Sequence, residues 1–421
     1  KDLFPLNRSL TGEGNKETLI YLKKIFSGIR IKKFNSGKKV NSWKIPLEWN
    51  IKQAYIENKK GKRILDFKKN NLHVIGYSLP IDKNLSYKQL SKKIYFLKQQ
   101  PNAIPYVTSY YKKDWGFCMS YKEFKKIDPK EKFKIKIDSK HTKGNLIYGE
   151  AFIPGKSKKE ILLTTNICHP SMANNELSGP IVLTALGSYL AKKKNNFFSY
   201  RILYLPETIG SIAYINQNKN KLKKNVVAGF VVVCVGDNKN WSLLSSPKGD
   251  TLADNVATYV LRTEKINYKK YNFFNDRGSD ERQFCWPGVN LPVCSIMRSK
   301  YGTYKEYHTS LDNLKFISSI GLWSSFNIYK KVIKCLELNN TFYRNNYFGK
   351  SEPFLTKYKL IETLSQKSVY AKQKLMMQIA YLTTSKKTLV DLTILTGENL
   401  SKLKKIIKIL IMKKFLRKII I

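Results

Sequence analysis

ILLTTNICHP (residues 161–170) decides the fold, because the strand-like run at residues 161–165 leads there into Cys168, His169 and Pro170. Two further apolar runs end in the same way: residues 202–205 precede Glu207, and residues 226–235 precede Asp237. Short apolar runs without polar alternation are typical of buried parallel strands. In open α/β sheets, ligands and catalytic groups collect at the carboxyl ends of such strands. The sequence therefore predicts an α/β fold whose strand ends bring a His, a Glu and an Asp together.

The composition is that of a globular protein with room for two or three domains in its 421 residues. Hydrophobic residues make up 42% of the chain, which is enough for a packed core, and no apolar run is long enough to cross a membrane. The N-terminus has no apolar segment typical of a signal peptide. The six cysteines are widely spaced and show no disulfide or metal-binding framework. We therefore expect reduced thiols and a cytoplasmic location.

The net charge of +47 admits two interpretations. A dedicated basic surface would bind nucleic acid. Alternatively, lysine accumulates together with Asn and Ile under a compositional bias toward A/T-rich codons, and we favour this interpretation because the lysines are spread over nearly every segment. Either way, so large a charge favours non-specific binding of anionic partners at low salt.

The pattern of apolar and polar residues changes along the chain, and these changes predict three parts. Residues 1–45 and 150–345 alternate strands and helices and form the core, whose simplest architecture is a doubly wound sheet. Residues 46–149 are rich in short strands and turns, which predicts an inserted β-rich domain. Residues 350–421 read as three helices followed by a basic strand, the pattern of a C-terminal winged helix-turn-helix.

The segment CHPSMANNELSGP (residues 168–180) is the densest in polar side chains that bind metals. His169 can offer an imidazole nitrogen, and Glu176 lies seven residues later at the start of a predicted helix, where the helix dipole favours a carboxylate. The alternative is a core histidine at a strand end beside a helix-capping glutamate. We favour the site because other candidate residues follow in the same order along the chain.

Two further positions support the site. Glu207 follows an apolar strand without an adjacent Lys or Arg, so partial burial should raise its pKa toward the range of a general base. His308 lies in a loop close to Asp312, which could hold the imidazole tautomer from behind. The alternatives are a glutamate that starts a helix and a solvated loop histidine. In residues 276–283, Arg277 and its neighbours either recognise an anionic substrate group or begin a solvated helix.

These residues carry a resemblance to a known family. The order of His169, the ANNELSG segment, Glu207, Asp237, the Ser279-Asp280 pair and the Tyr307-His308-Thr309 triplet resembles the co-catalytic zinc exopeptidases of the aminopeptidase Y and glutamate carboxypeptidase type. The chain more closely resembles a bacterial group of aminopeptidase-like proteins associated with polysaccharide biosynthesis. That group combines a zinc-exopeptidase-like mixed sheet flanked by helices, an inserted domain and a C-terminal winged helix. The resemblance spans essentially the whole chain.

The resemblance implies a set of site residues, with departures from the peptidase pattern. His169 corresponds to the first metal ligand, Glu207 to the general base and His308 to the final ligand. The bridging ligand position falls on Asn175, an amide that bridges cations poorly, so either Glu176 substitutes or the second metal is lost. Thr208 replaces the second glutamate of the peptidases. We expect one or two zinc ions, ligated from the set His169, Glu176, Asp237 and His308, with Asp312 behind them and substrate contacts from Asn175, Arg277, Asp280 and Tyr307.

The function implied is metal-assisted hydrolysis of a small amide or peptide. Zinc would polarise the amide carbonyl and lower the pKa of its bound water, and Glu207 would carry the proton to the leaving amine. Two other functions stay open: a catalytically inactive scaffold that kept the peptidase fold, and a nucleic-acid-binding regulator that acts through the winged helix. The second is not favoured, because the last 70 residues contain little arginine and base readout usually depends on arginine. The inserted domain carries a group of aromatic residues that could cap the cleft and set specificity, or hold a homo-oligomer together: Tyr106, Tyr110, Tyr111 and Trp115.

Overall fold

The computed structural model describes residues 1–358 and 367–420 of the chain. The chain divides into two compact units: residues 1–253 with 266–329, and residues 254–265 with 330–421. Each unit has its own hydrophobic core.

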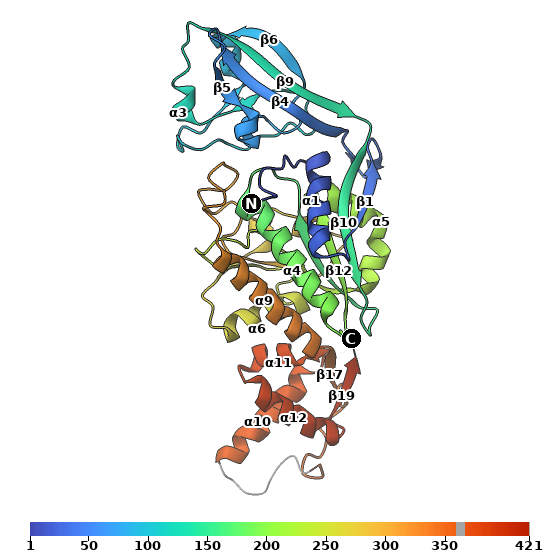
Figure 1. Ribbon diagram of the computed structural model, residues 1–421. Helices are drawn as coiled ribbons and strands as arrows, with labels where there is room; N and C mark the ends of the chain where they lie inside the picture. The colour runs from blue at the N-terminus through green and yellow to red at the C-terminus, as the bar shows by residue number, and fades with distance from the viewer. Residues whose placement is uncertain (359–366, 421) are drawn as a thin grey trace. The chain divides into compact units, whose positions relative to one another are not determined.

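An eight-stranded mixed sheet forms the core of the first unit (Figure 1). Its strands in spatial order are β1 (Arg30–Asn35), β10 (Asn145–Ile153), β12 (Ser199–Leu205), β11 (Glu160–Asn166), β13 (Val226–Val231), β16 (Val293–Met297), β14 (Ser242–Leu244) and β15 (Lys269–Tyr271). The four central strands β12, β11, β13 and β16 run parallel, whereas β10 and β1 extend the sheet in antiparallel fashion. The α/β fold class with a mixed sheet is confirmed.

Helices cover the sheet as the predicted doubly wound pattern requires. α4 (Ser178–Lys192) follows β11, and α5 (Ile209–Asn225) follows β12. Because β12 and β13 flank β11 on opposite sides, the two connections run in opposite directions across the sheet. Right-handed crossovers therefore place α4 and α5 on opposite faces. α1 (Glu13–Ile25) packs against α4 and β10, as the figure also shows (Figure 1).

The three apolar runs of the sequence become β11, β12 and β13. Every residue of β11 and β12 is buried, which explains why neither strand alternates with polar residues. The third run leaves the sheet after Val231, earlier than its apolar length suggests. The reason is that its last backbone N–H groups bond to side chains from the start of α4: Val235 N donates to Ser178 Oγ (2.9 Å), and Gly236 N donates to Asn174 Oδ1 (2.8 Å).

The segment between β1 and β10 carries a second, antiparallel sheet with its own apolar core. In spatial order its strands are β5 (Arg63–Asp66), β4 (Glu48–Asn58), β9 (Lys132–Thr142) and β6 (Ile81–Ser86). β9 alternates buried residues with more exposed ones over most of its length, as expected of a sheet with one covered face. Short elements complete the unit: β2 (Lys39–Val40), β3 (Trp43–Lys44), α2 (Tyr87–Leu90), β7 (Ile94–Tyr95), β8 (Phe117–Cys118), α3 (Tyr121–Phe124), α7 (Phe273–Asp276) and α8 (Glu281–Phe284).

The second unit contains helices packed with a three-stranded sheet of order β18-β17-β19. Its elements are most of α6 (Leu252–Thr263), the end of α9 (Ser319–Leu338), β17 (Thr341–Asn345), α10 (Lys367–Leu382), β18 (Lys387–Thr388), α11 (Leu389–Thr396), α12 (Leu400–Met412) and β19 (Leu416–Ile420). α11 begins with a capping box on Thr388 and ends at Gly397 in the left-handed conformation (φ 71°), the predicted C-cap. Of the predicted segment 350–421, residues 359–366 and 421 lie outside the described residues, and its winged-helix identity stays a prediction.

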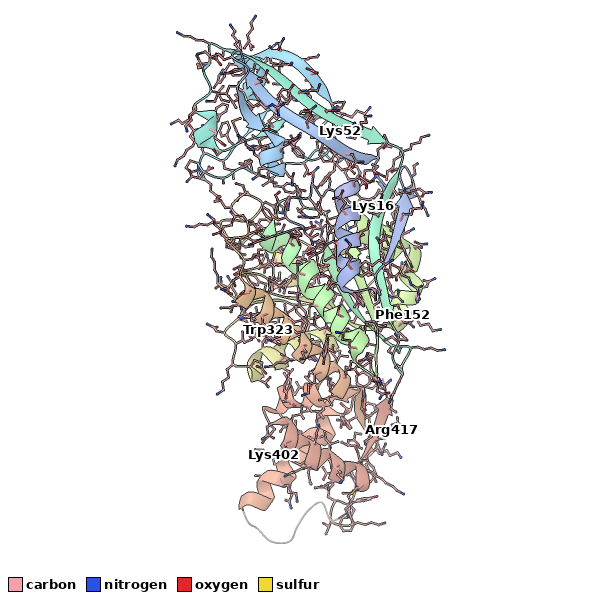
Figure 2. The ribbon with its side chains drawn as sticks, viewed as in Figure 1. Lys16, Lys52, Phe152, Trp323, Lys402 and Arg417 are labelled. Atoms are coloured by element: carbon pink, nitrogen blue, oxygen red, sulfur yellow. The ribbon has the colours of Figure 1, made fainter. Side chains whose placement is uncertain are left out.

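The charged side chains are distributed over all parts of the chain. Figure 2 shows Lys16, Lys52, Lys402 and Arg417 on four different elements, and all four are exposed. None of the described helices combines the length and the apolar content that a membrane crossing requires. All six cysteines are free thiols, as expected.

Candidate active site

The site forms where β11 and β12 end side by side. The two strands are parallel and in register up to the pair Asn166–Leu205, so the segments that follow them leave the sheet at the same edge. His169 and Glu207 lie on these segments, and His169 Nε2 is 3.7 Å from Glu207 Oε2. The parallel register predicted from the apolar runs therefore brings the first histidine and the candidate base together.

Glu176 holds His169 from behind. After the loop that follows His169, residues Ala173–Leu177 form a π-helical turn that leads into α4 and returns Glu176 to the strand end. Glu176 Oε1 accepts hydrogen bonds from the backbone N–H groups of His169 (2.8 Å) and Cys168, and Glu176 Oε2 is 2.7 Å from His169 Nδ1. A carboxylate on Nδ1 orients the ring and leaves Nε2 directed at Glu207. Burial alone would lower the pKa of His169, but the charges of Glu176 and Cys168 and the hydrogen bonds with both together raise it well above the ordinary value.

Glu207 is fixed through one oxygen and free at the other. Its Oε1 accepts hydrogen bonds from Asn166 Nδ2 (2.9 Å) and Ser279 Oγ (2.7 Å), and its Oε2 faces His169. Its backbone N–H donates to Cys168 Sγ (3.1 Å). Burial raises the pKa of Glu207 above its usual value, as the sequence predicted.

The turn after Glu207 is strained. Thr208 adopts φ 66°, ψ −77°, a conformation that a β-branched residue rarely takes. The buried carboxylate of Asp280 holds this turn, because Asp280 Oδ1 accepts from Thr208 N (2.8 Å) and Ser211 Oγ (2.8 Å). Burial raises the pKa of Asp280 to about 8. The structure thus places Asp280 beneath the candidate base, where it positions the turn that carries Glu207.

His308 lies on a loop and completes the cluster. Its own backbone is in the left-handed region (φ 54°). Its ring stacks on Tyr307 with centroids 3.9 Å apart and lies 5.2 Å from the ring of His169. His308 Nε2 is buried and makes no hydrogen bond with any described residue. Burial, and secondarily the charge of His169, lowers the pKa of His308 to about 3. The imidazole is therefore neutral, with a buried nitrogen that lacks a partner.

Asp312 supports the site from below. It accepts hydrogen bonds from the backbone N–H groups of Ala173 (3.1 Å), Asn174 (2.6 Å) and Asn175 (2.9 Å) and from Tyr304 Oη (3.2 Å). These bonds fix the start of the π-helical turn. Burial raises the pKa of Asp312 to about 6. The Asp312 carboxylate therefore binds two partners, Tyr304 and the turn that carries Glu176. The sequence had suggested the ring of His308 as its partner.

Asp237 and Asn175 occupy the remaining predicted ligand positions. Both oxygens of Asp237 are engaged, by Ser299 N and Ser299 Oγ (2.9 Å each), Asn174 Nδ2 (3.0 Å) and Lys239 N (2.8 Å). Asn175 Nδ2 points at Cys234 Sγ (3.7 Å), and its Oδ1 is buried without a hydrogen-bond partner among the described residues. Arg277, predicted to bind substrate, is exposed, and its guanidinium lies 5.5 Å from the centroid of the Phe273 ring.

Several contacts within the site were not recognised from the sequence. Asn166 and Ser279 bond Glu207, and the buried Arg8 donates through Nε to the carbonyl of His169 (3.1 Å). Tyr106 arrives from the segment between β1 and β10: its ring is 5.1 Å from that of His169 and 5.2 Å from that of His308. Asn166 could have been found, since it too ends an apolar run. The sequence suggested that Tyr106 could cap the cleft, but it did not identify His169 and His308, 63 and 202 positions further along the chain, as the rings it contacts.

Among the described residues, Cys168, His169 and Glu176 form the group whose potential ligand atoms all lie within 4.8 Å of one another. Cys168 is a weak ligand as it stands, because burial raises the pKa of its thiol to about 12. The two imidazoles are better suited to zinc. His169 presents Nε2 with its ring orientation fixed, and His308 presents a neutral nitrogen without another partner. Imidazole nitrogens are typical zinc ligands, so the chemistry of these two donors suits zinc, although His308 lies outside the group of three.

Comparisons with known proteins assign the chain to a family. Residues 1–339 match the family described as Domain of unknown function (DUF4910). The chain belongs to this family. A Clostridium acetobutylicum relative, named as a candidate polysaccharide biosynthesis protein with an aminopeptidase-like domain, is 40% identical over 405 residues, which is 96% of this chain and 92% of the relative.

Two solved structures share the fold of this chain. A crystal structure of a candidate peptidase from Clostridium acetobutylicum is 38% identical with a TM-score of 0.84, covering 99% of this chain and 94% of that chain. A zinc aminopeptidase from Bacillus subtilis shares the fold at 13% identity, with a TM-score of 0.56 over 78% of this chain and 90% of that chain. The predicted resemblance to aminopeptidase-like proteins is thereby confirmed, and so is the aminopeptidase-like fold of this member of the DUF4910 family.

Proposed function

We propose that this chain is a zinc-dependent hydrolase of a small amide, with Glu207 as the general base. The observation that carries the proposal is the pair of imidazole nitrogens, His169 Nε2 and His308 Nε2, in a buried cluster with the partly free carboxylate of Glu207. Zinc held by these two nitrogens would supply a Lewis acid for an amide carbonyl and would lower the pKa of a bound water. Glu176 orients His169, which is the usual role of a carboxylate on the far nitrogen of a metal-binding histidine.

Glu207 has the features of a proton carrier. Its raised pKa makes it a stronger base than an exposed glutamate, which suits a group that takes up a proton and releases it to the leaving amine. The bonds from Asn166 and Ser279 keep Oε1 in place, so that Oε2 performs the transfer. Tyr106 lies over both histidines and excludes water from that side. We propose aminoacyl groups, short peptides or amino-acylated sugars as the substrates, the last because the Clostridium relative is named for polysaccharide biosynthesis.

Replacing Glu207 by Gln tests the proposal. We expect turnover of aminoacyl and dipeptide substrates to fall by about 10²-fold or more, since the amide cannot accept the proton, whereas bound zinc is retained. Elemental analysis of the same preparation measures the zinc. Glu17→Gln, on the exposed face of α1, serves as the matched control and should leave turnover unchanged. Hydrolysis by Glu207→Gln at the rate of the unaltered chain would exclude Glu207 as the base.

One observation favours a second candidate, a metal-free scaffold that kept the peptidase fold. Asn175 and Thr208 stand where the resemblance places a bridging carboxylate and a second glutamate. The His169→Ala/His308→Ala double variant separates the two. Zinc that is present in the unaltered chain and lost in the variant supports the hydrolase, whereas absence of zinc from both supports the scaffold.

A further inference from the structure

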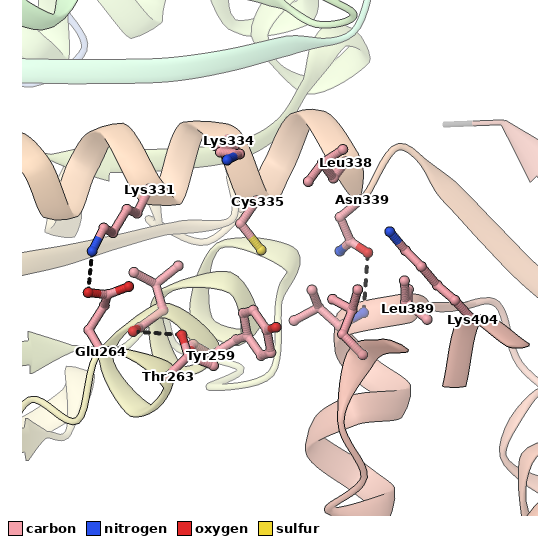
Figure 3. A pocket seen from close by; sticks show the side chains of 13 residues that line it. Tyr259, Thr263, Glu264, Lys331, Lys334, Cys335, Leu338, Asn339, Leu389 and Lys404 are labelled. Carbon is pink, nitrogen blue, oxygen red and sulfur yellow. Dashed lines mark hydrogen bonds and ion pairs between the residues drawn. The ribbon is translucent and has the colours of Figure 1, made fainter. Parts of the chain in front are cut away.

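A cavity of about 330 Å³ lies within the second unit and is lined entirely by residues of 254–265 and 330–421 (Figure 3). Its wall is mainly apolar and is formed by Val260, Leu338, Leu389, Val390 and Leu400. The volume is in the range of small-molecule sites, which combine apolar walls with a few polar groups that orient the ligand.

A buried amide marks the polar end of the cavity. Asn339 lines the cavity and is only 3% exposed. Its Oδ1 accepts a hydrogen bond from the backbone N–H of Val390 (3.2 Å) in the first turn of α11, which fixes the orientation of the amide. Its Nδ2 makes no hydrogen bond with any described residue. A buried donor without a partner is destabilising, so its persistence indicates a group that binds there.

Two of the lysines around the cavity form no ion pair with any described residue. The carboxylate of Glu264 is already paired with Lys331 (Figure 3). The hydroxyl of Thr263 donates to the carbonyl oxygens of Tyr259 (2.9 Å) and Val260 (3.1 Å) of its own helix. Lys334 and Lys404 also line the cavity, and neither forms an ion pair within the described part of the chain. In the view of Figure 3, the Lys404 ammonium points toward Asn339.

We infer that this cavity binds a small amphipathic carboxylate. The free polar groups, Asn339 Nδ2 and the ammonium groups of Lys404 and Lys334, are donors only, so they require an acceptor, and two of them favour a negative charge. The apolar wall accommodates a short hydrocarbon chain. This site is separate from the proposed hydrolase site, because none of its residues belongs to the His169 cluster.

Calorimetric titration of the full chain with sodium octanoate tests the inference. We expect saturable binding at one site, no comparable binding of 1-octanol, and about tenfold weaker binding by Lys404→Gln, since one charge-assisted hydrogen bond is lost. Lys408→Gln, one turn further along α12 and outside the cavity, is the matched control and should bind octanoate normally.

A second variant tests the amide. Asn339→Asp keeps the acceptor for the Val390 N–H and replaces the donor with a negative charge, so it should abolish octanoate binding without unfolding the unit. Thermal melting of the same samples checks the fold. The inference is overturned if octanoate gives no saturable heat, if 1-octanol binds equally well, or if Lys408→Gln loses as much affinity as Lys404→Gln.

Discussion

The two glutamates of the site differ in what surrounds each oxygen. Both oxygens of Glu176 are occupied, by two backbone N–H groups and by the ring of His169, so this carboxylate positions a ligand. Glu207 keeps one oxygen free of side-chain donors other than His169. Identical functional groups therefore acquire different roles from their neighbours: Glu207 keeps the expected place of a base, whereas Glu176, expected as a metal ligand, orients His169.

Glu176→Gln tests the positioning role. The amide cannot accept from two backbone N–H groups and also from His169 Nδ1 with the strength of a carboxylate. We expect zinc affinity to weaken by about 10- to 100-fold, with turnover recovering when zinc is supplied in excess. Competition with a chromogenic chelator measures the affinity. Turnover that stays lost at saturating zinc would instead assign Glu176 a part in the chemistry.

Asn175→Asp tests the metal count. A carboxylate at this position can bridge two cations, whereas the native amide cannot, so the variant should raise bound zinc from about one to about two per chain. Asn175→Ala, which offers no ligand, should stay at the native ratio. Elemental analysis after dialysis distinguishes them. An unchanged ratio in Asn175→Asp would show that the neighbouring groups do not support a second ion.

Among the helices and strands, those that depend on local sequence were predicted correctly. The apolar runs at residues 161–165 and 202–205 are strands, they are parallel, and their ends converge as expected. The prediction was less accurate where side chains from other elements accept the hydrogen bonds of backbone N–H groups. The run at 226–235 leaves the sheet early because Ser178 and Asn174 provide its hydrogen bonds.

The site was predictable to the same extent. His169, Glu207 and His308 lie together, and each is flagged by a strand end or by the family resemblance. The partners of Asp237 were not predictable, because Ser299 comes from a distant loop and takes up its oxygens. Tyr106 was expected as one of several aromatic residues that could cap the cleft, but its contacts with the two histidines depend on the path of the chain between β7 and β8.

The buried ion-pair network of β12 makes a prediction about stability. Arg201 pairs with Glu160 (2.6 Å) and Glu150, all three largely buried. Arg201→Met leaves the buried Glu160 without its cation and Glu150 with Lys32 as its remaining cation, and should destabilise the unit by about 3–5 kcal/mol. Urea unfolding followed by tryptophan fluorescence measures this. Arg30→Met, at an exposed position of β1, is the control and should unfold as the native chain does.

The same network predicts the response to acid. Burial alone would raise the pKa of Glu150, but the hydrogen bonds from Lys32 and Tyr214 and the charge of Arg201 lower it overall. A carboxyl whose pKa is depressed on folding stabilises the fold above its unfolded pKa, about 4.3, and loses that contribution as the pH falls further. The Glu150 contribution to stability should thus be lost only below about pH 4.3, and Arg201→Met should lose less stability on acidification than the native chain.

At the scale of the whole molecule, the charge of +47 predicts association with polyanions. Affinity for random duplex DNA should fall by about tenfold or more between 50 and 200 mM salt, since such binding releases counterions. Hydrolysis of an uncharged dipeptide should change little, because a buried site is weakly screened. Fluorescence anisotropy and turnover, measured in the same buffers, provide the comparison. Tight binding of one DNA sequence at 200 mM salt would favour a nucleic-acid function instead.

The route of the chain to Tyr106 has a consequence for what enters the site. Residues 104–106 hydrogen-bond along the loop that carries His308: Tyr106 N donates to the His308 carbonyl (2.9 Å), and Pro105 is bridged to Thr309. The Tyr106 ring, which lies over the two histidines, therefore belongs to a stretch of sequence that contains none of the proposed metal ligands. Under the proposed function, mutations in this stretch would alter what enters the site and leave the metal ligands and Glu207 unchanged.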